Sequence, residues 1–126
     1  MNPDYQFPFE KLRVWQEARS WIGSVYQITA GFPQKEAFNL TSQLNRASVS
    51  VAANLAEGAG RVSPKDQAHF SQIAYGSLME AACLAILSAD RGHIDPDQLT
   101  GQRKTIAGLA NQINALRQSQ LARANA

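Results

Sequence analysis

The chain has 126 residues, a length that suits one domain. Hydrophobic residues make up 44% of it and charged residues 17%, so the chain can bury a core and is not expected to be disordered. The net charge of +2 is too small to identify a partner by itself, and the single cysteine, Cys83, excludes an intrachain disulfide framework.

No segment has the pattern of an export signal or a membrane span. The first residues, MNPDYQFPFEK, lack the apolar core of a signal peptide. The longest apolar run covers residues 81–87, far short of the ~20 residues that cross a bilayer. Together with the lone thiol, these features lead us to expect a soluble, cytoplasmic protein.

The first periodic segment, residues 9–30, predicts a helix with a wide apolar face. Its expected core positions alternate three and four residues apart: Trp15, Ala18, Ile22, Val25 and Thr29. On the flank, a second apolar line repeats every seven residues: Val14, Trp21 and Ile28. Because this arc exceeds the roughly 100° stripe of an ordinary surface helix, we predict that the flank contacts another subunit.

The second predicted helix, residues 36–57, carries two stripes at helical spacing. The apolar stripe consists of Leu40, Leu44, Ala47, Val51 and Leu55. The polar stripe consists of Gln43, Arg46, Ser50, Asn54, Glu57 and Arg61. Gly58 and Gly60 then predict a helix stop, because glycine accepts left-handed dihedrals at little cost.

The polar stripe has two interpretations. In the structural one, Glu57 and Arg61 form an i,i+4 pair, and Asn54 or Glu80 satisfies buried polar groups and fixes helix register. In the functional one, the stripe forms a subunit seam or lines a central channel. Because the stripe runs directly beside the core, a structural or seam role is favoured.

Two further helices are predicted to begin at N-cap residues. Residues 64–90 follow Ser63 as N-cap, with an expected core line of Phe70, Ile73, Ser77, Ala81 and Leu84, flanked by Ala74, Leu78 and Ala85. Residues 96–121 follow Asp95, which can form a capping box with Gln98. Their core line is Leu99, Gln102, Ile106, Leu109, Ile113, Leu116 and Gln120. Four helices with short links predict an all-α, antiparallel up-down-up-down four-helix bundle that forms one domain, residues 1–126.

No catalytic or metal-binding pattern is present. A di-iron bundle needs glutamate-x-x-histidine pairs, but no histidine stands three residues after a glutamate, and His69 and His93 are isolated in sequence. The segment from Gly58 to Arg61 lacks the lysine and the preceding strand of a phosphate loop, although Arg61 could still hold an anion. We therefore predict no enzyme activity, catalytic residue, cofactor or small-molecule substrate.

Basic residues are the remaining functional candidates. Residues 98–126 contain four of them and no acid, but these four do not share one helical face. With two bases of the polar stripe they form the set of possible phosphate contacts: Arg46, Arg61, Arg103, Lys104, Arg117 and Arg123. No base-reading motif is present, so any nucleic-acid binding is expected to use backbone and shape.

Several short blocks resemble one known family. They are LRVWQEA at residues 12–18, residues 26–36 with Phe32-Pro33, residues 40–47, Ser50 with Asn54, AEGAGR at residues 56–61, and residues 74–80. In these blocks the chain resembles the proteins encoded by intervening sequences in bacterial 23S ribosomal RNA genes, the S23 family. Asn39 and Ala81 depart from the usual glycine and leucine of that family.

The resemblance implies a four-helix-bundle protomer in a ring-like homo-oligomer, a pentamer, with no established enzymatic activity. Related bundles accompany diversity-generating retroelements, where a basic pentamer assists a reverse transcriptase and binds nucleic acid. Our first hypothesis is therefore a non-enzymatic homo-oligomer that binds structured RNA or DNA. The alternative is a protein-interaction scaffold with no nucleic-acid role. The salt dependence of binding distinguishes the two hypotheses, because the affinity for phosphate groups falls steeply with ionic strength whereas that of an apolar protein contact does not.

Overall fold

The computed structural model describes residues 2–126, and these form four long helices. They are α1 (Arg13–Thr29), α2 (Leu40–Ala59), α3 (Pro64–Asp90) and α4 (Pro96–Ala124). Two short 3-10 turns, η1 (Pro8–Lys11) and η2 (Gln34–Glu36), precede α1 and α2. No strand occurs among the described residues, so the predicted all-α class is confirmed.

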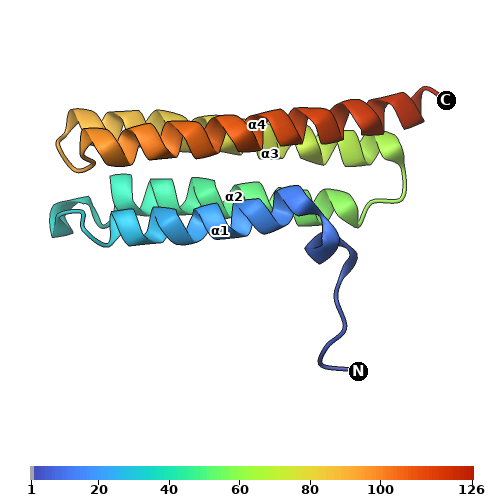
Figure 1. Ribbon diagram of the computed structural model, residues 1–126, viewed down its shortest axis with the longest axis horizontal. Coiled ribbons are helices and arrows are strands. Elements are labelled where there is room, and N and C mark those ends of the chain that lie inside the picture. The colour runs from blue at the N-terminus through green and yellow to red at the C-terminus, as the bar shows by residue number, and fades with distance from the viewer. Residues whose placement is uncertain (1) are drawn as a thin grey trace.

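The helices run in alternating directions and pack as two layers, α1 with α2 and α3 with α4 (Figure 1). Each helix contacts the next one in the chain, and α4 returns to contact α1. This is the predicted up-down-up-down bundle. One end of it carries the α1–α2 and α3–α4 links, and the other carries the N-terminal segment, the α2–α3 link and the C-terminus.

The last two helices begin at the predicted caps. Ser63 Oγ accepts a hydrogen bond from the Asp66 backbone N–H at 3.1 Å. Asp95 Oδ1 accepts one from the Gln98 N–H at 2.8 Å, and Gln98 Oε1 accepts one from the Asp95 N–H at 3.0 Å. α4 continues to Ala124, about one turn beyond the expected boundary at residue 121.

The first two helices begin later than predicted. Pro8 opens only the 3-10 turn η1, and Leu12 is extended, so α1 starts at Arg13 and not at residue 9. Asn39 is also non-helical, with φ −130° and ψ −106°, which separates η2 from α2. Glu36, which the sequence placed in the helix, is instead held by His93 of the α3–α4 link, with Oε2 and Nε2 2.8 Å apart.

The two glycines near the end of α2 do not adopt the left-handed dihedrals that were predicted for a helix stop. Gly58 lies inside the helix, and Gly60 has φ −87°, so neither residue uses the left-handed region. A Cβ on Gly58 would stand 2.9 Å from Phe70 Cβ on α3. Gly58 is therefore required for the close approach of α2 and α3, whereas the only left-handed residue among those described is Gly92, with φ +78°, in the α3–α4 link.

The core confirms the predicted faces of α2 and α4 and corrects those of α1 and α3. The five apolar positions of α2 are all buried, and so is the central line of α4. In α1, Trp15 and Ile22 only pack at the edge, and the buried line is Val14, Ala18, Trp21, Val25 and Thr29. In α3, Ile73 is 38% exposed, and the buried line passes through Ala74, Leu78, Ala81 and Ala85. α3 is rich in small residues on every side, so periodicity alone defined its face poorly.

By length and composition alone, α3 is long and apolar enough to cross a membrane. Within the bundle, however, α3 packs between α2 and α4 and places Ala74, Leu78, Ala81 and Leu84 in the shared core, while Leu87 remains exposed. Helices that contribute to the core of a helical domain can have the same length and composition.

Candidate functional site

The middle of the polar stripe on α2 forms a hydrogen-bonded network with α3. Asn54 Nδ2 donates to the backbone carbonyl of Ser50 at 2.8 Å and to Ser50 Oγ at 3.0 Å. Ser50 Oγ lies 2.9 Å from Ser77 Oγ on α3. All three side chains are half-buried, so the network satisfies polar groups beside the core and joins the two helices.

Toward the start of α2, the stripe lines a shallow groove. Gln43, Arg46 and Ser50 line it from α2, Glu80 from α3, and Tyr26 lies at its α1 side. Gln43 is anchored, because its Nε2 donates to Asn39 Oδ1 at 2.7 Å. Arg46 and Glu80 are exposed and carry opposite charges. The groove therefore presents both a cation and an anion at the surface.

Two basic residues contact the same glutamine at the end of the bundle that carries the α2–α3 link. Arg61 pairs with Glu57 at 2.9 Å, and its guanidinium lies 4.5 Å from the centre of the Phe70 ring. Gln67 connects this residue to α4, because its Nε2 donates to the Arg61 carbonyl at 2.9 Å and its Oε1 accepts from Arg123 at 2.8 Å. We call Arg61, Gln67 and Arg123 the basic corner.

Charge differs between the two ends of the bundle. The end with the α1–α2 and α3–α4 links holds four acids and two bases: Glu36, Asp90, Asp95, Asp97, Lys35 and Arg91. Around the basic corner stand three bases and two acids: Arg61, Lys65, Arg123, Glu57 and Asp66. The N-terminus of α3 lies here too, but so do the C-termini of α2 and α4, whose dipoles have the opposite sign, so the excess positive charge comes from the side chains.

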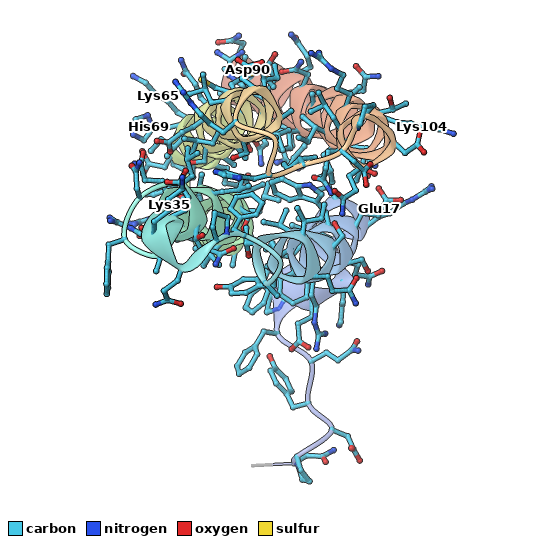
Figure 2. The ribbon with its side chains drawn as sticks, turned by 90° about the vertical axis from the view of Figure 1, so that its left-hand side faces the viewer. Glu17, Lys35, Lys65, His69, Asp90 and Lys104 are labelled. Carbon is cyan, nitrogen blue, oxygen red and sulfur yellow. The ribbon has the colours of Figure 1, made fainter. Side chains whose placement is uncertain are left out.

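The other predicted phosphate contacts are dispersed. Figure 2 shows Lys104 and Glu17 pointing out on one side of the bundle, while Lys65 and His69 point to the other. Lys104 lines a cleft between α1 and α4, and Arg103 lines an apolar groove between α3 and α4. Arg117 Nε is buried, with no hydrogen-bond partner among residues 2–126. The six bases thus form no continuous patch on one protomer.

The apolar flank predicted to contact another subunit lies largely inside the protomer. Val14 is 6% exposed and Trp21 is 2% exposed, while Ile28 is half-buried. Trp21 Nε1 donates to Gln102 Oε1 on α4 at 2.8 Å, and Gln102 Nε2 donates to Ser24 Oγ at 3.1 Å. The wide arc of α1 is explained by this second helix neighbour, so Val14 and Trp21 are corrected to core residues.

Sequence reasoning missed the polar pairs that join neighbouring helices at every seam. They are Thr29–Asn45 at 2.9 Å, Ser50–Ser77 at 2.9 Å, Ser71–Gln120 at 2.7 Å and Trp21–Gln102 at 2.8 Å. The signal was clearest in α4, where two glutamines interrupt an apolar heptad line. Thr29 and Ser77 also stood in predicted core lines, and Ser50 in the polar stripe, but the sequence did not reveal their partners. Each pair leaves few relative positions for its two helices, because a slipped register would bury unpaired polar groups.

Glu36 and His93 form a second feature that the sequence did not reveal. Their side chains are 12% and 11% exposed, and the Phe32 ring lies 5.5 Å from the imidazole. The hydrogen bond from His93, more than its charge, holds the pKa of the Glu36 carboxyl below its usual value, against the opposing effect of burial. His93 is therefore isolated in sequence but paired in the fold, and it joins the two links at one end of the bundle.

The described residues contain no cluster of three His, Cys, Asp or Glu side chains that could hold a metal ion. Cys83 is exposed on α3. The polar groups that occur near one another are amides, hydroxyls and oppositely charged pairs, which can position helices and bind polar partners.

The fold and these surfaces define an all-α four-helix bundle whose polar residues join helices and line open grooves. The model of one family, described as 23S rRNA-intervening sequence protein, matches residues 10–115. This range includes most of the chain and reaches into α4, so the protein belongs to the 23S rRNA-intervening sequence protein family. Comparison with curated proteins gives no match.

Proposed function

We propose that this protein is a non-enzymatic, cytoplasmic homo-oligomer, a pentamer, that binds structured RNA or DNA through backbone contacts. Membership of the 23S rRNA-intervening sequence protein family supports the bundle as the working unit. The observation that carries the nucleic-acid part is the basic corner, where Gln67 of α3 contacts both Arg61 of the α2–α3 link and Arg123 of α4.

The basic corner suits phosphate for electrostatic reasons. Guanidinium groups form strong, charge-assisted hydrogen bonds with phosphate oxygens, and Lys65 in the first turn of α3 adds a third positive charge. Arg61 is held in place by Phe70 and Glu57, which lowers the entropy that it would lose on binding. One corner is weak, but a ring with all protomers in one orientation repeats it on a single rim, and phosphate contacts add.

The shallow groove on α2 is proposed as a subunit seam. Ser50 and Asn54 already have partners within the protomer, whereas Arg46 and Glu80 point outward with opposite charges. A neighbouring chain could pair with both, and the lining of a central channel would use the same residues.

The first test is binding of the purified protein to a labelled RNA hairpin and a DNA duplex of matched length across a salt series. We expect affinity to fall steeply between about 50 and 200 mM salt, because each phosphate contact contributes a slope of about −0.9 for duplex DNA. Absence of binding at low salt would overturn the nucleic-acid proposal.

A double variant tests the basic corner itself. Arg61→Gln with Arg123→Gln should weaken binding to any sequence and make the salt slope shallower by about 0.9 for each lost contact. The matched control is Lys35→Gln with Arg91→Gln, which removes the same charge from the acidic end. Equal weakening by both pairs would show that net charge, and not the corner, is responsible.

The alternative, a protein-interaction scaffold, is favoured by one observation. α3 exposes apolar side chains on its outer surface, with Ile73 at 38%, Met79 at 37% and Leu87 at 45%. An apolar partner contact would survive moderate salt, so a partner that stays bound where RNA dissociates would favour the scaffold.

A further inference from the structure

The N-terminal segment carries aromatic side chains that cover no core. Residues 2–7, which we call the aromatic arm, extend away from the helices at the end of α1 (Figures 1 and 2). Tyr5 is 56% exposed and Phe7 is 46% exposed. Exposed rings in such density are costly unless a partner covers them.

The arm is ordered by its own rings. Tyr5 and Phe7 meet edge to face at 5.5 Å, Phe7 and Phe9 stack at 5.9 Å, and Phe9 meets Trp15 of α1 at 4.9 Å. The Phe7 N–H also donates to Glu10 Oε1 at 2.9 Å. A segment that is already fixed in an outward position loses little entropy when it docks.

An apolar groove lies on the other layer of the bundle. Only residues of α3 and α4 line it, among them Met79, Ile86, Leu99, Ile106 and Ala107, and its volume is about 230 Å³. An apolar cavity of about 150 Å³ can hold a benzene ring, so an aromatic side chain fits. Methionine at the rim adds favourable sulfur–ring contacts.

Charge complements this fit. Arg103 is the one charged residue that lines the groove. Asp4 directly precedes Tyr5 in the arm, where it would meet Arg103 once the ring is inserted. Rim pairs of this kind contribute more to orientation than to affinity.

The arm is poorly placed to fill the groove of its own chain. Figure 1 shows it leaving on the α1–α2 side, whereas the groove belongs to the α3–α4 layer. Residues 2–7 span at most about 20 Å when extended, roughly the thickness of the two helix layers that they would have to pass. A contact between the arm of one chain and the groove of the next joins different surfaces, which is the kind of contact that closes rings.

We propose that the aromatic arm of one chain docks in the α3–α4 groove of a second copy, with Tyr5 or Phe7 in the groove and Asp4 facing Arg103. This inference rests on the self-assembly part of the proposed function and names the surfaces that assemble. It does not depend on nucleic-acid binding.

Cross-linking tests the contact directly. In a Cys83→Ser background, a full-length chain with Gln6→Cys, which keeps both rings, is co-expressed with a tagged chain that carries Ala107→Cys, and a short bis-maleimide is added. We expect a cross-linked pair of the two different chains. The matched control places the thiol at Ser119, which is exposed on α4 but outside the groove. No cross-link at Ala107, or equal cross-linking at Ser119, overturns the proposal.

The mass of the protein in solution tests whether self-association depends on the arm. Tyr5→Ser with Phe7→Ser should reduce the mass measured by light scattering while helical content stays unchanged, because neither ring is in the core. Asp4→Lys should weaken self-association at least several-fold, and Arg103→Glu in the same chain should restore it. If the wild type is oligomeric and the arm variants keep its mass, the arm proposal is wrong while assembly stands. A monomeric wild type overturns both.

Discussion

Single buried polar residues that pair across the helix seams strongly influence the stability and register of this bundle. Trp21 is the clearest case, since its ring is in the core and its N–H is satisfied only by Gln102. A buried amide oxygen without its donor costs ~1–3 kcal/mol, which is a large share of the stability of a small domain. The four seam pairs therefore select one register from several that the apolar stripes alone would tolerate.

Replacing Trp21 tests this argument. Trp21→Phe keeps most of the apolar surface but leaves Gln102 Oε1 without its donor, so the free energy of unfolding should fall by about 1–3 kcal/mol. Adding Gln102→Leu removes the unpaired amide and should recover part of the loss. Urea denaturation of the two variants measures both effects, and a fully stable Trp21→Phe would contradict the role of the pair.

The burial of Trp21 also changes what a charge at this position would do. On an exposed flank, Trp21→Glu would split an oligomer and leave the helices intact. With the side chain 2% exposed, the carboxylate would enter the core without a partner and unfold the protomer. Loss of the far-UV helical signal together with loss of mass is the expected result.

At the scale of elements, helix boundaries depend on what each helix meets. α3 and α4 begin where their local caps predict, because a cap is satisfied within a few residues. α2 begins only after η2, where Glu36 pairs with His93, and its last turn carries Gly58 at the close approach to Phe70. A local sequence pattern does not predict contacts of this second kind, because the two partners belong to different elements.

Two glycine substitutions measure the difference between local and tertiary effects. Gly58→Ala should destabilise the protein by about 1–3 kcal/mol, because the new Cβ would overlap Phe70. Gly23→Ala on α1 is the control: nothing lies within 4 Å of its Cβ position, so the better helix propensity of alanine should stabilise by up to about 1 kcal/mol. Thermal unfolding that shows the same sign for both would contradict the close packing of α2 on α3.

At the scale of the whole molecule, Glu36 and His93 hold together the two links at one end of the bundle. A carboxyl whose pKa is lowered in the folded state stabilises the fold above its unfolded pKa, and this stability is lost as pH falls through the lowered folded pKa. The contribution of Glu36 should thus be complete above its ordinary pKa of 4.5 and should disappear below it.

The pH dependence can be measured against a neutral variant. Glu36→Gln keeps a similar shape but cannot carry the charge that His93 stabilises. The wild type should melt at a higher temperature than Glu36→Gln above about pH 5, and the difference should narrow as the pH falls below 4.5. A difference that stays constant down to pH 3 would show that the charge of Glu36 does not contribute.

The sequence was sufficient for the class, the four helices, their order and the caps of α3 and α4. The amphipathic period, the cap residues and the short links are local features, because each lies within a few residues of the element that it controls. The buried line of α2 was also predicted from the sequence, because Leu40, Leu44, Val51 and Leu55 alternate with polar neighbours at helical spacing.

Only the tertiary structure decided which side of α1 and α3 is buried, why Gly58 is glycine, and that His93 has a partner. It also separated Arg103, Lys104 and Arg117 and brought Arg61 and Arg123 together through Gln67. These outcomes depend on pairs of residues far apart in the chain. A pattern along one helix cannot encode which of two apolar lines meets the next helix, since that is determined by packing and hydrogen bonding across the seam.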